Sequence, residues 1–322
     1  MSQHFLLTAA ARTLSLSAVA RMSDEEAHAK FVAIRWADND GKPYCPDCGC
    51  LKVYAYKTRK LWKCPACRYQ FSVTARTIFA DRKRPIRDYL LAIAIFANGA
   101  KGHSALQLSR DLDCQYKTAF VLAHKLREAL GAVVQSGPKL AGEVEVDGMY
   151  TGGHRKPENK KADRVDRRLA EEQTGKRQVV VIVRERMGRS LPFVVPRESA
   201  AVPLIRQHVA SGTIVHADEA AGWDALHGSY DTRRVNHSVE YVAADGASVN
   251  WAESYFSRLR RAEYGVHHRI SGRHLQAYAD EMAWREDARR EPNGLQWRRI
   301  TGAALRHPMS ETWRGYWGKK AA

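Results

Sequence analysis

Residues 143–153, EVEVDGMYTGG, decide the fold of the second half of the chain. Their apolar and acidic side chains alternate with a period of two, which predicts a β-strand that carries its acids on one face. That face carries Glu143, Glu145 and Asp147. The pattern therefore predicts that Asp147 ends a half-buried strand.

Further strand patterns follow along the chain. They are QVVVIVRE at 178–185, LPFVVP at 191–196 and GTIVHADEA at 212–220, with the helical pattern VPLIRQHVA at 202–210 before the last one. Strands that alternate with helices predict a mixed α/β domain. The segment 153–178 is dense in charge and almost free of large apolar residues, so we expect an exposed insertion between the first two strands.

Three carboxylates in this domain have the placement expected of metal ligands. Asp147 and Asp218 come at the ends of predicted strands, and Glu253 lies in the helical pattern VNWAESYFSRLRR at 249–261. Hard divalent cations such as Mg²⁺ prefer oxygen ligands, and a substrate phosphate can complete their coordination. The alternative is chance placement, because the chain contains 35 acidic residues.

Upstream of this domain, four cysteines form the pattern C-x2-C-x15-C-x2-C: Cys45, Cys48, Cys64 and Cys67. Two CxxC pairs at this spacing present four thiolates to one zinc ion, and such a closed site is structural rather than catalytic. Cys50 lies close by but lacks the matching spacing. A redox CxxC pair, or four reduced cysteines in a loop, is the alternative. The pattern predicts a zinc ribbon.

Basic and aromatic residues alternate around these cysteines, a mixture that suits contact with a DNA backbone. A solvated face with some packed aromatic rings is the alternative interpretation. The residues concerned are Lys52, Lys57, Arg59, Lys60, Lys63 and Arg68, with Tyr54, Tyr56, Trp62 and Tyr69.

Two helical patterns follow the ribbon. Ser104 can cap a helix over SALQLSRDL at 104–112, and a second helix begins near Lys117 after a short turn. This arrangement predicts a helix-turn-helix, and an ordinary helical hairpin is the alternative. The residues that we expect to be available to a DNA groove are Lys117, His124, Lys125 and Arg127.

Composition limits the classes of function. The chain has 322 residues, enough for two or three domains, and 44% of them are hydrophobic. Its 52 Lys and Arg against 35 Asp and Glu give a net charge of +17, which favours nucleic acid as a partner. No run approaches the roughly 20 apolar residues of a spanning helix, so we expect a soluble protein without a membrane partner. Paired CxxC motifs fit a reducing cytoplasm.

Several collinear stretches resemble the zinc-ribbon DDE insertion-sequence transposases, the ISXO-like group. The resemblance implies an α/β multidomain protein in which a zinc ribbon and a helix-turn-helix precede a ribonuclease H-like mixed-sheet catalytic core. It extends from about residue 25 to residue 286. The stretches are RWADNDGKPYCPDCG, KCPACRYQFSVTARTIF, KGHSALQLSRDLDCQYKTAF, VEVDGMYTGG, HADEAAGWDAL, VNHSVEYV and VNWAESYFSRLRRAEYGVHHRISGRHLQAYADEMAWR.

The resemblance also implies roles for particular residues. Asp147 matches the first acid of the family, Asp218 the second and Glu253 the third, and together they would hold two Mg²⁺ or Mn²⁺ ions. Asn250 competes for the third position, because the family pattern has Asn or Glu there. Arg260 stands where the family has Lys, and we expect it to keep a contact with phosphate because it keeps the charge.

Histidines near these acids are secondary candidates. His216 comes two residues before Asp218, and His267 and His268 follow the predicted helix. A histidine beside a strand-end acid is more often a packed or hydrogen-bonded residue than a catalytic one. Ser248 stands where some members of the family carry a histidine.

The resemblance divides the chain into five segments. A helical pattern at 24–38, which Ser23 can cap, leads into the zinc ribbon, and the residues after 287 show no clear periodicity. The expected segments are an N-terminal helical segment at 1–40, the zinc ribbon at 41–80, the helix-turn-helix region at 81–138, the ribonuclease H-like DDE domain at 139–286 and a basic tail at 287–322.

The implied activity is metal-dependent phosphoryl transfer on DNA, in which the ends of an insertion sequence are bound, cut and joined to a target. The implied partners are the terminal inverted repeats and target DNA, with a homo-oligomer formed on DNA. The implied location is the bacterial cytoplasm, in association with the nucleoid. A ribonuclease H-like nuclease without joining activity, and an inactive DNA-binding regulator derived from a transposase, are the alternatives.

Overall fold

The computed structural model describes residues 4–56, 58–152, 160–163, 177–236, 243 and 246–318. The chain divides into two compact units. The first unit combines residues 1–133 with residues 288–322, and the second consists of residues 134–287. The first unit is therefore built from both ends of the sequence.

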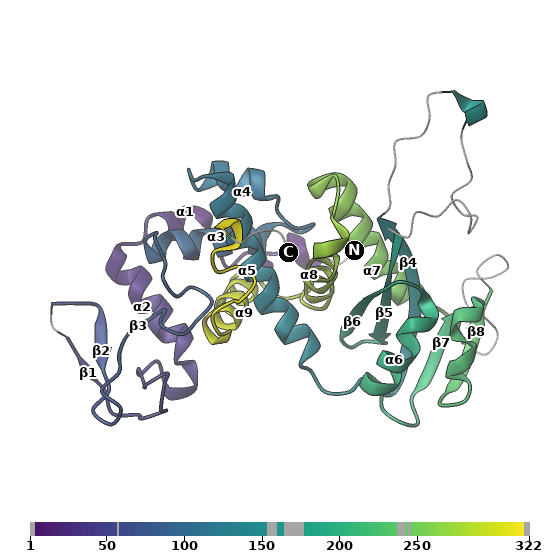
Figure 1. The fold of residues 1–322 in the computed structure, drawn as a ribbon, viewed down its shortest axis with the longest axis horizontal. Helices are drawn as coiled ribbons and strands as arrows, with labels where there is room; N and C mark the ends of the chain where they lie inside the picture. The colour runs from purple at the N-terminus through teal and green to yellow at the C-terminus, as the bar shows by residue number, and fades with distance from the viewer. Residues whose placement is uncertain are drawn as a thin grey trace. The chain divides into compact units, whose positions relative to one another are not determined.

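Helices form most of the first unit (Figure 1). Helix α2 begins with a capping box, in which Ser23 and Glu26 bond each other's backbone NH groups, so the predicted leading helix is confirmed although it ends at Arg35. The helices are α1 (Leu16–Ala20), α2 (Asp24–Arg35), α3 (Ile86–Asn98), α4 (Ala105–Asp111), α5 (Tyr116–Gln135), which continues into the second unit, and α9 (Asn293–Arg306).

Helix α9 packs against α2 and α3, although no helix was expected beyond residue 287. Its buried face includes Trp297 and Ile300, and the indole NH of Trp297 donates to the carbonyl oxygen of Leu90 at 3.0 Å. The side chain of Asn293 accepts hydrogen bonds from the backbone of residues 13 and 14. Small apolar residues and arginines fill the rest of the helix, which weakens its periodic pattern.

The zinc-ribbon segment forms a three-stranded antiparallel sheet. Its strands are β1 (Tyr54–Ala55), β2 (Leu61–Lys63) and β3 (Gln70–Ser72), in the order β1-β2-β3. Trp62 and Phe71 are register partners and their rings stack, with centroids 5.9 Å apart. Such short strands bury little apolar surface, so aromatic packing and a bound metal are the main sources of stability available to this sheet.

The second unit is a five-stranded mixed sheet with helices on both faces. The strands are β4 (Glu143–Gly152), β5 (Arg177–Glu185), β6 (Ser190–Val195), β7 (Ile214–Asp218) and β8 (Asp231–Val235), in the order β6-β5-β4-β7-β8. Strand β4 is antiparallel to β5 and parallel to β7, and β7 is parallel to β8. The expected α/β layout is therefore confirmed, with β8 as an additional strand that was not predicted.

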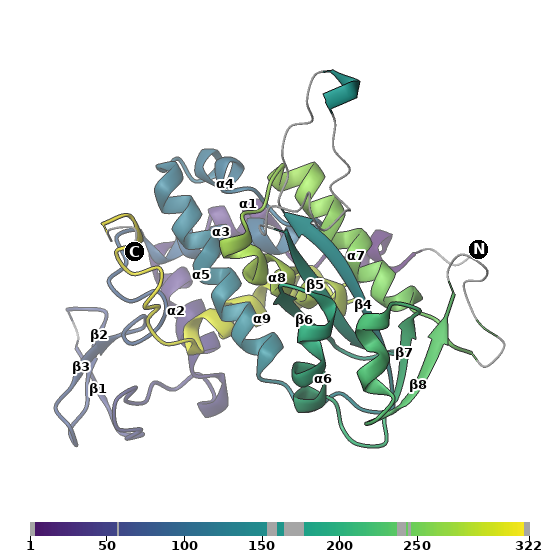
Figure 2. The same ribbon diagram turned by 45° about the vertical axis from the view of Figure 1, so that its right-hand side comes forward.

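Three helices accompany this sheet, and they are α6 (Val202–His208), α7 (Asn250–Ala262) and α8 (Leu275–Asp287). Helix α7 contacts β4 and β5, and α8 contacts α7 and β6. Figure 2 shows α7 and α8 behind the sheet, with α6 in front of it. The valines of β4 and β5 that lie between these layers are fully buried and form the core.

The expected insertion at 153–178 falls mostly outside the described residues. Residues 160–163, which are described, are exposed and contain one helical turn, Lys161–Asp163. Of the helices in the described ranges, none combines the length and the apolar character needed to cross a membrane.

Candidate metal sites and nucleic-acid interface

The four cysteines of the ribbon converge on one point. The sulfur atoms of Cys45, Cys48, Cys64 and Cys67 all lie within 4.8 Å of one another. Cys45 Sγ is 3.5 Å from Cys67 Sγ, and Cys48 Sγ is 3.6 Å from Cys64 Sγ. Sulfurs around a tetrahedral zinc ion are about 3.8 Å apart, because Zn–S bonds are about 2.3 Å long. The donor set therefore fits one structural zinc ion.

Backbone NH groups prepare part of this site for a cation. Those of Cys67 and Ala66 hydrogen bond to the sulfur of Cys64 and, together with the thiols of Cys48 and Cys67, lower the pKa of the Cys64 thiol to about 6, whereas the pKa values of Cys48 and Cys67 are raised by desolvation and by their neighbouring thiols. A lowered pKa favours the thiolate form that binds metal. Cys50 lies outside the cluster, and its thiol donates instead to the carbonyl oxygen of Lys52 at 3.4 Å.

The aromatic and the basic residues around the ribbon differ in how they are exposed. Several aromatic rings pack inward, since Trp62 lies 5.4 Å from the ring of Trp36, which is buried, and Tyr69 stacks on Phe71. Lys57 lies outside the described residues. The basic residues that are exposed are Lys52, Arg59, Lys60, Lys63 and Arg68.

The carboxylates Asp147 and Asp218 lie on neighbouring strands. Strands β4 and β7 run parallel, with Val146 opposite Ala217, so the two acids are the next residue of each strand. Asp218 ends β7 as expected, but β4 continues past Asp147 to Gly152. Parallel neighbours in register point to the same face of a sheet, which brings the two side chains together.

Glu253 and the two aspartates interact electrostatically. Burial raises the pKa of Asp147 to about 7, and a hydrogen bond from the NH of Gly148 lowers it in part. The negative charges of Asp218, Glu198 and Glu253 raise it further. Like charges that act on a buried carboxyl in this way attract a cation, which would remove their repulsion.

Asp147, Asp218 and Glu253 influence one another electrostatically, but their oxygen atoms do not form a compact set of metal ligands. Among the residues placed by the structure, the cysteine cluster is the only group of three or more possible ligands within 4.8 Å of one another. Glu253 is exposed, as are Asn250, the first residue of α7, and Arg260, near its end. Glu253 and Asn250 are one helical turn apart, so both belong to the same end of α7.

The loop after β7 holds Asp218 in place. Its Oδ1 accepts hydrogen bonds from the indole NH of Trp223, at 2.8 Å, and from the NH of Ala220, at 3.2 Å. Trp223 is fully buried in the helical turn η7 (Ala221–Leu226). Arg234 of β8 donates to the carbonyl oxygen of Asp218 at 2.6 Å. These bonds restrict Asp218 to one orientation.

Glu145 joins the strand of Asp147 to the helix of Glu253. It is fully buried, and its Oε2 accepts the backbone NH groups of Trp251, at 2.7 Å, and Ala252, at 3.2 Å. These NH groups belong to the first turn of α7 and have no partner within the helix. A carboxylate at a helix N-terminus is also favoured by the helix dipole. Glu145 therefore anchors the first turn of α7 to β4.

Two arginines of β5 and the following turn complete this anchor. Arg186 bonds Oε1 of Glu145 at 3.1 Å and the hydroxyl of Ser248 at 2.9 Å. Arg184 donates to the carbonyl oxygen of Trp251 at 2.8 Å and pairs with Glu286 of α8, both side chains being almost fully buried. The N-terminal turn of α7 is thus bound to the sheet by several charged hydrogen bonds.

The three candidate histidines differ in their contacts. His216 is fully buried on β7, and its Nε2 lies 3.0 Å from Oε2 of Glu143. His267 packs edge-on against Tyr278 at 4.7 Å, and His268 is exposed with a positive φ of 57°. The preference for a packed or hydrogen-bonded role of His216 is confirmed.

Sequence inspection missed a fourth carboxylate near Asp147. Glu198 begins the turn η6 (Glu198–Ala201) after β6, and burial together with the charge of Asp218 raises its pKa. A Cβ on Gly148 would lie 2.6 Å from Oε1 of Glu198, and a Cβ on Gly222 would lie 2.9 Å from its Cβ. The two glycines leave room for this side chain. Its position just after a strand is the signal that could have identified it.

Helices α4 and α5 form where the sequence predicts them, but the basic residues of α5 are less exposed than expected. Ser104 caps α4 by accepting the NH of Gln107. Of the four residues expected to face a groove, His124 and Arg127 are buried, and Lys125 is half-buried and donates to the carbonyl oxygen of Ile78 at 2.8 Å. Lys117 is exposed. The expectation was wrong for His124, on which Trp313 of the C-terminal tail stacks, and for Arg127, whose guanidinium lies over the ring of Phe96 on α3.

Two protein-family models match parts of the chain. The transposase zinc-ribbon domain matches residues 22–70, and the ISXO2-like transposase domain matches residues 139–287. No curated protein and no solved structure gives a significant match. The first match contains the cysteine cluster, and the second contains the carboxylates of β4, β7 and α7.

Proposed function

We propose, from the membership of this chain in the zinc-ribbon family of ISXO-like DDE transposases, that it binds the ends of an insertion sequence and catalyses DNA strand cleavage and strand transfer. Both family domains occur in the order that the sequence resemblance implies. Transposase domains imply DNA as the substrate, and the net charge of +17 suits that partner.

The observation that carries the proposal is the register of β4 and β7, which brings Asp147 and Asp218 together, with Glu253 of α7 as their electrostatic neighbour. Asp147 of β4, Asp218 of β7 and Glu253 of α7 are close enough for their charges to raise the pKa of Asp147. The order β6-β5-β4-β7-β8, with its first three strands antiparallel and its last three parallel, supports a ribonuclease H-like core.

The proposed chemistry divides the work among these residues. Asp147, Asp218 and Glu253 would hold two Mg²⁺ or Mn²⁺ ions, whose oxygen preference fits the three carboxylates. When bound, such ions activate an attacking water or DNA 3′-hydroxyl and stabilise the leaving oxygen. Arg260, exposed two turns after Glu253, would contact the DNA phosphate backbone.

Glu253 is favoured over Asn250 as the third ligand. Its charge acts on Asp147, which supports a position close to the first aspartate. An ionised carboxylate also binds a hard cation better than a neutral amide does. Asn250 would then orient substrate at the N-terminal end of α7.

The first unit is the proposed DNA-binding part. Its zinc ribbon exposes a group of basic residues, and α4 and α5 form two helices joined by a tight turn in which Asp113 has a positive φ of 46°. This arrangement supports a helix-turn-helix in which Lys117 faces DNA. We retain the boundaries 1–40, 41–80, 81–138, 139–286 and 287–322 as the proposed division, with a homo-oligomer formed on DNA.

The test is cleavage and joining by the full chain. We would incubate it with genomic fragments that carry the ends of the element, with Mg²⁺, and score both cut strands and joined products. Asp147→Asn, Asp218→Asn and Glu253→Gln should each abolish cleavage and leave DNA binding intact, since they remove charge but preserve size. Cutting without joining would favour a nuclease, and binding without cutting would favour a regulator. If Glu253→Gln cuts normally while Asn250→Ala does not, Asn250 is the third ligand.

A further inference from the structure

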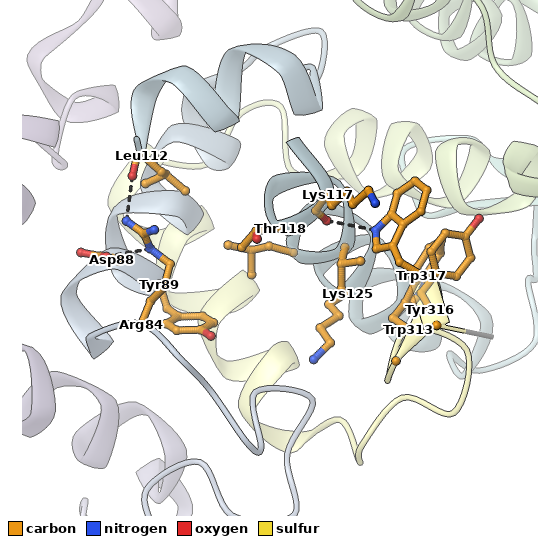
Figure 3. Close-up of a pocket in the computed structure, with 14 residues that line it drawn as sticks. Arg84, Asp88, Tyr89, Leu112, Lys117, Thr118, Lys125, Trp313, Tyr316 and Trp317 are labelled. Carbon is orange, nitrogen blue, oxygen red and sulfur yellow. Dashed lines mark hydrogen bonds and ion pairs between the residues drawn. The ribbon is translucent and has the colours of Figure 1, made fainter. Parts of the chain in front are cut away.

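A cavity of about 330 Å³ opens beside the N-terminal half of α5 in the first unit. It lies between α5, the start of α3 and the C-terminal tail, far along the sequence from the carboxylates of the second unit. Figure 3 shows the three tail aromatics on one side and Tyr89 and Arg84 on the other, with Lys125 between them. Its volume is at the lower end of small-molecule pockets, which measure about 300–1,000 Å³.

The tail supplies an aromatic wall. Trp313 is buried against His124, with ring centroids 4.3 Å apart, whereas Trp317 keeps 49% of its surface exposed. Tyr316 links them, with centroids 4.6 Å from Trp313 and 5.2 Å from Trp317. The wall therefore has a fixed base at Trp313 and an accessible ring at Trp317.

Lys117 connects this wall to α5. The indole NH of Trp317 donates to the carbonyl oxygen of Lys117 at 3.3 Å, and Lys117 Nζ lies 5.4 Å from the centre of the same ring. The ammonium lies over one face of this half-exposed indole, so an anion attached to a ring that stacks on the remaining surface of the indole would meet it.

The rest of the lining is more basic than acidic. Its cations are Arg84, Lys117 and Lys125, and its acid, Asp88, is paired with Arg84 at 2.9 Å. Arg84 also donates to the carbonyl oxygen of Leu112 at 2.7 Å, which fixes its guanidinium at the rim. The charge balance of the cavity thus favours an anionic occupant, and its aromatic wall favours an occupant with a planar ring.

We propose that this cavity binds one unpaired nucleotide of DNA, with the base against Trp317 and Tyr316 and its phosphate beside Lys117. The size, the aromatic wall and the excess of positive charge all match a nucleotide, whereas an acidic peptide without aromatic residues would not supply the planar ring. The inference rests on the proposed function only in naming DNA as the source of the nucleotide. In this proposal, the C-terminal tail of the protein helps to hold a frayed or single-stranded end of the DNA.

The inference is tested with the full chain and a short fluorescent oligothymidylate, without added Mg²⁺. Trp317→Ala should weaken binding about tenfold, since a stacked base contributes roughly that factor or more, and Trp317→Phe should stay within about threefold of the wild type because it keeps a ring. Leu295→Ala is the control, because Leu295 is 44% exposed on α9 and does not line the cavity. Zinc content and circular dichroism establish that each variant is folded.

Unchanged affinity in folded Trp317→Ala would overturn the inference, as would equal loss in Leu295→Ala. Displacement of the oligonucleotide by an acidic peptide, or a Trp317-dependent change in the oligomeric state without oligonucleotide binding, would reassign the cavity to a protein partner. Asp147→Asn separates the two proposals, because it should lose cleavage and keep oligothymidylate binding. If the chain cleaves and joins DNA while Trp317→Ala binds the oligothymidylate with normal affinity, the nucleotide-binding role of the cavity is rejected. The proposed function is then unaffected.

Discussion

Glu145 is the residue on which the position of α7 depends most directly. Replacing it with Gln keeps its size but removes the charge that the first turn of α7 and Arg186 both bond. We expect Glu145→Gln to lower the free energy of unfolding by about 2 kcal/mol, since buried hydrogen bonds to a charged group contribute roughly that amount. It should also slow metal-dependent cleavage. Chemical denaturation and a cutting assay measure the two effects.

Glu143→Gln is the matched control for that change. Glu143 lies on the same face of β4 and also bonds Arg186, but its side chain is 42% exposed. Its side chain bonds Arg186 and His216, neither of which belongs to α7. Equal losses in both variants would mean that the bond to Arg186, rather than the anchor on α7, is what matters.

Asp280 makes the stability of the second unit depend on pH. Burial raises the pKa of Asp280 to about 7 from the usual 3.8, although hydrogen bonds from Gln135 and Gln276 lower it in part. The folded protein therefore binds this proton more tightly than the unfolded chain. The contribution of the protonated Asp280 carboxyl to the free energy of unfolding is fully present below about pH 4. It is lost as the pH rises through about 7.

Asp280→Asn should remove this loss. We expect the difference in unfolding free energy between pH 4 and pH 8 to shrink by up to about 4 kcal/mol. Urea unfolding at several pH values measures it, with Asp231→Asn, whose side chain is 62% exposed, as the control. Parallel curves for the wild type and Asp280→Asn would contradict the assignment.

At the scale of elements, the zinc ribbon depends on its metal. Cys64→Ser removes one thiolate from the cluster, so zinc content should fall from about one ion per chain to near zero, because closed sites of this kind bind weakly once a ligand is lost. Elemental analysis of the purified protein measures this. Cys50→Ser, which changes a thiol outside the cluster, should keep its zinc. Retention of zinc by Cys64→Ser would contradict a four-cysteine site.

Elements with strong local patterns were predictable from the sequence. The alternation in β4, the apolar runs of β5 and β6 and the caps of α2 and α4 depend on residues within a few positions of one another. Strand β8 was missed because DTRRV is polar, and it pairs only through its register with β7. Helix α9 was missed although Trp297, Ile300, Ala304 and Leu305 recur at helical spacing, because small residues make up part of its buried face.

The candidate site was predictable in its residue types but not in its connections. Asp218 ends a recognisable strand and Asp147 lies within one, so both could be identified from local patterns. The bond from Glu145 to α7 joins residues 106 and 107 positions apart. Likewise, the burial of His124 depends on Trp313 from the far end of the chain. Local periodicity carries no information about such contacts.

At the scale of the whole molecule, the net charge of +17 predicts a strong effect of salt on DNA affinity. Bound basic residues release counterions from DNA, so affinity should fall at least tenfold between about 50 and 200 mM salt. Replacing Lys52, Arg59 and Lys63 with Ala should reduce the slope of log affinity against log salt by up to about 3. Fluorescence anisotropy with a duplex of the element's end measures it.

A charge-matched variant separates local contact from general attraction. Arg12, Arg21 and Arg298 are exposed in the first unit outside the ribbon, and their replacement with Ala removes the same charge. The slope should change less in this variant than in the ribbon variant. Equal slopes would indicate attraction by the whole charge of the protein instead of contact by the ribbon.

The first unit is made from both ends of the chain, and this has a consequence for biosynthesis. Residues 1–133 leave the ribosome early, but α9, which covers α2 and α3, is synthesised only after the entire second unit. A nascent or prematurely terminated polypeptide therefore exposes the apolar surface that Trp297 and Ile300 would bury. The first unit can be completed only after α9 has been synthesised, so translation itself delays the moment at which the proposed DNA-binding part is whole.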